Sequence, residues 1–157
     1  MELHQKAPDF TTKASDGERI EDFTLSKELG KEHIVLAFFP LAFTSVCTNE
    51  MCQFRDQMQQ FHQLKARVYG ISVDSPFALN AFIKANGLKF KLLSDFNKEI
   101  SRAYGVLYED LMGLKGVAKR SVFVLDKNGI LRYKWVSEDP KVLPNFDEIQ
   151  KVLQGLG

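Results

Sequence analysis

The sequence predicts an α/β fold in which helices flank a mixed β-sheet, and three observations support this. Apolar, β-rich runs alternate with helical segments along the chain. These runs are nearly continuous in apolar residues, which is typical of strands that are buried on both faces of a sheet. Near the C-terminal end, two runs flank Asn128-Gly129, a strong signal for an antiparallel hairpin. Parallel crossovers followed by a hairpin indicate a sheet of mixed strand direction.

The strands are expected where apolar, β-branched or aromatic residues cluster between turn signals. Five segments meet this description: IVLAFF (34–39), VYGISV (68–73), KLLSD (91–95), SVFVLD (121–126) and ILRYKWV (130–136).

The helices are expected between these strands and after the last one. Met51, Phe54, Met58 and Phe61 recur at the spacing of one helix face, which predicts a helix through this region. The other helices are predicted at 77–86, opened by Asp74-Ser75-Pro76 and closed by Gly87, at 97–104, and at 145–153 after Pro144. The resulting order of strands and helices is the thioredoxin-like arrangement with insertions.

Length and composition indicate an ordinary globular protein. The 157 residues fit one domain spanning 1–157, with 45 % hydrophobic and 26 % charged residues. The net charge of +1 and the absence of a basic stripe argue against a nucleic-acid partner. No apolar run approaches the roughly 20 residues that span a bilayer, and the first ten residues do not resemble a signal peptide. We therefore expect a cytoplasmic protein without a membrane partner.

Both cysteines lie in the stretch PLAFTSVCTNEMC (40–52), directly after a predicted strand. A helix beginning near Thr44 or Ser45 places Cys47 in its first turn, where free backbone N–H groups and the helix dipole favour a thiolate. Cys47 is therefore positioned to act as a nucleophile. The same residue shares a face with Met51 and Phe54, so a small buried core residue is the alternative.

Cys52 lies about 140° around the helix from Cys47, with the two Cα atoms roughly 8–9 Å apart. A disulfide needs a separation below about 7 Å, so the bond requires the first turns of the helix to unwind. Zinc binding is a competing use of two nearby thiols. Only His4, His33 and His62 are available to complete such a site, and they are scattered in the sequence. We expect no metal and no cofactor, and we expect His33 and His62 at the surface.

Several motifs resemble those of the peroxiredoxins. Pro40, Thr44 and Cys47 match the P-x-x-x-T-x-x-C signature, and C-T-x-E-x-C-x-F-R-D (47–56) is similar to the PrxQ, or bacterioferritin-comigratory, type. SVDSP (72–76), LLSD (92–95), Tyr104-Gly105 and R-x-x-F-V-L-D (120–126) also fall where peroxiredoxins have similar strings. PLAFT (40–44) looks more like the one-cysteine AhpE type, and Leu41, Ser45 and Val46 depart from the PrxQ pattern.

The resemblance implies a thiol-dependent peroxidase on a thioredoxin-like fold. In it, Cys47 would attack a hydroperoxide and become a sulfenic acid. Thr44 and Arg120 would hydrogen-bond the sulfur and the peroxide, Pro40 would shield the thiolate, and backbone N–H groups near Val46 would complete the cradle.

Further roles follow from the same resemblance. Glu50 would have a supporting role, either by stabilising the helix or by positioning Arg120. Cys52 would resolve the sulfenic acid as an intramolecular disulfide, which thioredoxin or a glutaredoxin-like dithiol protein would reduce. The chain would act as a monomer or homodimer. A one-cysteine peroxidase using an external thiol, a thiol–disulfide oxidoreductase and a redox sensor remain alternatives.

Overall fold

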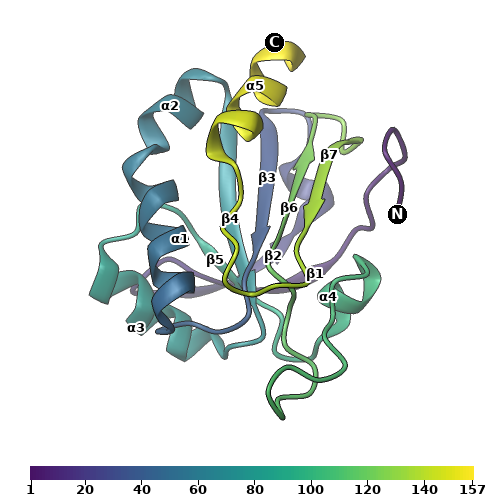
Figure 1. The fold of residues 1–157 in the computed structure, drawn as a ribbon. Helices are drawn as coiled ribbons and strands as arrows, with labels where there is room; N and C mark the ends of the chain where they lie inside the picture. Colours follow the sequence, from purple (N-terminus) through teal and green to yellow (C-terminus); the bar gives the residue numbers. More distant parts are fainter.

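Seven strands form one mixed sheet in the computed structural model, which describes residues 1–157 (Figure 1). The strands are β1 (Thr11–Ser15), β2 (Ile20–Thr24), β3 (His33–Phe38), β4 (Ala66–Ser72), β5 (Leu92–Ser94), β6 (Ser121–Leu125) and β7 (Leu131–Val136). Their order across the sheet is β2-β1-β5-β4-β3-β6-β7. The strands β3, β4 and β5 are parallel to one another, whereas β6 pairs antiparallel with β3 and β7 pairs antiparallel with β6. This topology confirms the predicted mixed sheet.

Helices cover both faces of the sheet, and each face has its own hydrophobic core. One face carries α1 (Ser45–Asp56), α2 (Met58–Gln63), α3 (Pro76–Asn86) and α5 (Phe146–Leu156). The other face carries the 3-10 helix η1 (Leu25–Glu28) and α4 (Glu99–Ala103). The residues of β3 alternate between the two cores, and all six are buried, which explains the unbroken apolar run in the sequence. None of the helices has the length and apolar character needed to cross a membrane.

Local signals predicted the ends of α3 correctly. Ser75 is its N-cap and its hydroxyl accepts a hydrogen bond from the Ala78 N–H, while Pro76 occupies the first turn. Gly87 ends the helix with a φ of 58°, a left-handed conformation that favours glycine. The predicted Asn128-Gly129 hairpin also forms between β6 and β7, with Gly129 at a φ of 83°.

Four details differ from the sequence prediction. The helix predicted through Phe61 is broken at Gln57, so that α1 and α2 are separate although their apolar residues remain buried. The helix predicted at 97–104 is limited to α4, and α5 extends to Leu156. The antiparallel pair β1–β2 was not predicted, because its residues are mostly polar and do not form an apolar run.

The prediction of a surface position was wrong for His33 and right for His62, which is exposed. His33 is 3 % exposed because it begins the fully buried strand β3. Its burial lowers the pKa of the imidazole.

Candidate active site

Cys47 lies in the first turn of α1 and is only 1 % exposed. The helix begins at Ser45, and Thr44 is the N-cap with extended backbone, as the sequence predicts. Met51 and Phe54 continue the buried stripe of the same helix into the core. Both sequence interpretations of Cys47 therefore describe its position. It belongs to the core cluster, and it also stands at the helix end that favours an anion.

Sheet topology brings Arg120 to the sulfur. Because β6 runs antiparallel to β3, the start of β6 lies beside the end of β3, with Ser121 paired to Phe38. Arg120 directly precedes β6, and the segment leading to α1 directly follows β3. The two functional side chains thus meet although they are 73 positions apart in sequence.

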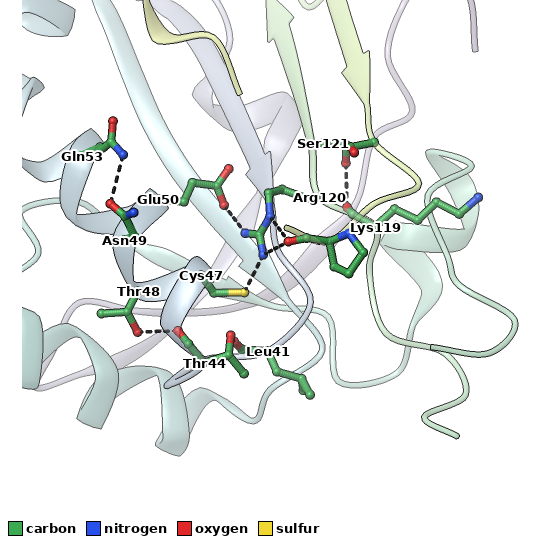
Figure 2. A network of polar contacts seen from close by, with 12 residues as sticks. Leu41, Thr44, Cys47, Thr48, Asn49, Glu50, Gln53, Lys119, Arg120 and Ser121 are labelled. Carbon is green, nitrogen blue, oxygen red and sulfur yellow. Dashed lines mark hydrogen bonds and ion pairs between the residues drawn. The ribbon is translucent and has the colours of Figure 1, made fainter. Parts of the chain in front are cut away.

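The Arg120 guanidinium is the centre of a buried hydrogen-bond network (Figure 2). Its Nη2 donates to Cys47 Sγ at 3.1 Å, and its Nη1 donates to Glu50 Oε1 at 2.8 Å. Its Nε and Nη2 both donate to the carbonyl oxygen of Pro140, at 3.0 and 2.9 Å. Arg120 is 1 % exposed and Glu50 is fully buried, so this fork of donors is fixed against three acceptors.

The electrostatics of the network follow from this burial. Burial raises the pKa of Glu50 to about 7, although the nearby positive charge of Arg120 acts to lower it. Burial also opposes the charge of Arg120, but Glu50 and Cys47 outweigh that effect and hold the pKa of the guanidinium above its ordinary value. A cation that stays charged beside a sulfur favours the thiolate form of that sulfur.

The remaining predicted site residues surround Cys47 in different ways. Pro40 is buried two residues after the end of β3, and Val46 is half-buried in the first turn of α1. The Thr44 hydroxyl donates to the Leu41 carbonyl oxygen at 2.9 Å, so this hydrogen bond is directed to the loop and not to the sulfur. No side chain caps the first turn of α1, which leaves its backbone N–H groups, including those of Val46 and Cys47, without a capping acceptor.

Comparison with known proteins decides the family. Residues 3–134 match the model of the AhpC/TSA family. The chain belongs to the AhpC/TSA family. Its relatives include the chloroplastic 2-cysteine peroxiredoxin of Chattonella marina var. antiqua, which is 40 % identical over 99 % of this chain and 80 % of that protein. The mitochondrial thioredoxin-dependent peroxide reductase of Drosophila melanogaster is 35 % identical over 98 % of this chain and 66 % of that protein.

Solved peroxiredoxin structures have the same fold as this chain. The reduced 2-Cys peroxiredoxin of Plasmodium vivax superposes with a TM-score of 0.87 at 31 % identity, covering 96 % of this chain and 79 % of that one. The predicted thioredoxin-like α/β fold is thereby confirmed, and the chain is a thiol-dependent peroxidase of the peroxiredoxin class.

The second cysteine of this peroxiredoxin lies on the same helix but outside the Arg120 network. Cys52 is half-buried, and its Sγ lies 3.8 Å from Asn86 Oδ1 at the end of α3. Arg55 Nη1 donates to the Asn86 carbonyl oxygen at 2.6 Å and so ties the same part of α1 to α3. Both cysteines are free thiols. Because α1 is continuous between them, the separation of roughly 8–9 Å expected from helix geometry applies.

Sequence reasoning missed Pro140. It lies in the segment between β7 and α5, and its contribution to the site is a backbone carbonyl, which every residue type carries. The same segment is tied to the site a second time, because the Ser137 N–H donates to the Arg120 carbonyl at 2.9 Å. No residue pattern signals such a contact. No group of three or more His, Cys, Asp or Glu side chains lies together in a way that would hold a metal ion.

Proposed function

We propose that this peroxiredoxin reduces hydroperoxides through Cys47 and resolves the oxidised sulfur with Cys52 in the same chain. The observation that carries the first half is the contact of 3.1 Å between Arg120 Nη2 and the buried Cys47 sulfur, at the uncapped N-terminus of α1. It combines a nucleophile, a fixed cation and free backbone donors in one place. Thiolate attack on a peroxide requires these three kinds of group.

In the first step, the Cys47 thiolate attacks the terminal oxygen of the hydroperoxide. A sulfur–oxygen bond forms, the oxygen–oxygen bond breaks, and the leaving oxygen takes a proton to become water or an alcohol. Four of the five guanidinium N–H groups of Arg120 are used by Cys47, Glu50 and Pro140. The fifth N–H, on Nη1, and the first-turn backbone N–H groups would stabilise the charge that moves onto the leaving oxygen.

In the second step, Cys52 attacks the sulfenic sulfur and releases water, which leaves an intramolecular disulfide. Cys52 is the only other cysteine in the sequence. Because the intact helix keeps the Cα atoms roughly 8–9 Å apart, the first turns of α1 must unwind. Met51 and Phe54 are buried and anchor the rest of the helix, so the change would be confined to its N-terminal end. This pairing within one helix corresponds to the PrxQ type.

A dithiol protein of the thioredoxin or glutaredoxin kind would then reduce the disulfide. The name of the Drosophila relative, thioredoxin-dependent peroxide reductase, supports such a reductant. We keep a monomer or homodimer in the cytoplasm as the expected state, with the single domain 1–157.

The test is the reaction of reduced wild type, Cys52→Ser and Cys47→Ser with one equivalent of hydrogen peroxide, followed by stopped flow and intact-mass analysis. We expect the wild type to lose the mass of two hydrogen atoms, Cys52→Ser to gain one oxygen on Cys47, and Cys47→Ser to react no faster than a free thiol. If wild type and Cys52→Ser both stop at the same sulfenic acid, Cys52 is not the resolving residue and the one-cysteine mechanism applies. If neither outpaces a free thiol, Cys47 is not the peroxidatic residue.

A further inference from the structure

Glu50 is a fully buried acid, and only one of its two carboxyl oxygens has a hydrogen-bond partner. Its Oε1 accepts the hydrogen bond from Arg120, whereas its Oε2 is buried without any hydrogen-bond partner. A charged carboxylate with one oxygen in this position loses its hydration without compensation. A proton on Oε2 removes that charge and leaves the Oε1 contact with Arg120 in place.

The charge count of the network leads to the same conclusion. Arg120 is the one cation, and it contacts two acids, the thiol of Cys47 and the carboxyl of Glu50. Its third partner, the Pro140 carbonyl, is neutral. If both acids were ionised, the buried network would carry a net negative charge, which is costly away from water.

We propose that Cys47 and Glu50 share a single proton across Arg120, so that the Glu50 carboxyl holds it while the sulfur is the thiolate. The equilibrium exchanges a thiol and a carboxylate for a thiolate and a carboxylic acid, and Arg120 stays charged throughout. Glu50 is then a positioning and proton-holding residue rather than a group that touches the peroxide. The inference rests on the proposed function only in taking Cys47 as the attacking thiol.

Among the surrounding charged groups, Arg120 is the one that affects the protonation of Glu50. Arg120 is the one charged group, from any element, that acts on Glu50, and its attraction only partly offsets the effect of burial on the pKa. Lys119 points away to Glu138 at 2.9 Å. Tyr108, whose hydroxyl donates to the Glu138 carbonyl, has its pKa raised by burial and stays neutral.

The sharing matters for the proton balance of the reaction. When the thiolate attacks a hydroperoxide, the leaving oxygen needs one proton, and the sulfur loses its negative charge as it becomes a sulfenic acid. Arg120 is then left with Glu50 as its only acidic partner, which favours the carboxylate. Glu50 therefore releases a proton in the same step that consumes one, and the chain takes up less than one proton from the solvent.

Infrared spectroscopy of the reduced protein tests the sharing without any peroxide. We expect wild type near pH 7 to show the carbonyl band of a buried carboxylic acid, which Glu50→Gln removes. In Cys47→Ser and Cys47→Ala, which cannot form a thiolate, the band should disappear at a pH lower by about one unit or more. Cys52→Ser is the matched control, because Cys52 lies on the same helix outside the network. It should leave the titration of the band unchanged.

Two results would overturn the proposal. One is an unchanged titration of the band in both Cys47 variants, which would mean that burial alone sets the protonation of Glu50. The other is the absence of the band from wild type near pH 7, which would mean that Glu50 is charged beside the thiolate. Neither result depends on the peroxide reaction, so a failure here is distinct from a failure of the proposed function.

Discussion

Replacement of Arg120 by methionine separates its structural role from its chemical role. The change removes the donor to Cys47 and leaves Glu50 buried without its cation. Breaking a buried ion pair from one side costs about 3–5 kcal/mol of unfolding free energy. We expect the lower end of this range for Arg120→Met, because the pKa of Glu50 is already raised to about 7 and the carboxyl can take up a proton.

The double variant Arg120→Met/Glu50→Gln should recover part of that stability, about 1 kcal/mol or more, because it no longer buries an unpaired acid. It should not recover activity. Loss of a donor that stabilises developing charge costs roughly 10²–10³-fold in rate, and both variants lack that donor.

The two quantities are measured separately, by urea unfolding and by stopped-flow reaction with hydrogen peroxide. A stability loss below about 1 kcal/mol in Arg120→Met would show that Arg120 is not the cation that stabilises this buried network. A double variant that reacts as fast as wild type would show that Arg120 only supports the fold.

Two further predictions concern stability. Burial raises the pKa of Glu50 from 4.5 to about 7, so between these two pH values the native state binds more protons than the unfolded chain. The unfolding free energy of wild type should therefore fall with rising pH, by on the order of 3 kcal/mol relative to Glu50→Gln. Parallel pH profiles of the two proteins in urea unfolding would refute this. Gly70→Ala would place a Cβ 2.6 Å from Leu92 Cδ2 and should cost about 1–3 kcal/mol. Gly155→Ala, which meets no atom within 4 Å, is its control and should stabilise α5 by about 0.5–1 kcal/mol; equal urea midpoints for the two variants would contradict the tight packing at Gly70.

Local sequence signals were reliable where the structure depends on neighbouring residues. The N-cap, proline and glycine of α3 lie where predicted, because capping involves groups only a few positions apart. The fully buried β3 was evident from its unbroken apolar run. The start of α1, and with it the position of Cys47 in the first turn, also lies where predicted, although no side chain caps this helix.

Local signals failed where the structure depends on packing against distant parts of the chain. The apolar stripe of 51–61 has one helical period, but the structure interrupts the helix at Gln57 and keeps the stripe buried on both sides of the break. His33 is polar and reads as a surface residue, yet it begins a strand that is covered on both faces.

The sequence by itself indicated Cys47, Glu50 and Arg120 as site residues, through the motif around Cys47 and the string that contains Arg120, but it did not indicate Pro140. Only the tertiary structure decided how they act together. Antiparallel pairing of β6 with β3 brings Arg120 to the sulfur, and the segment after β7 supplies the Pro140 carbonyl that holds the guanidinium. Burial then leaves Glu50 with one oxygen unpaired. These properties arise from contacts between residues 20 or more positions apart, and no local pattern encodes them.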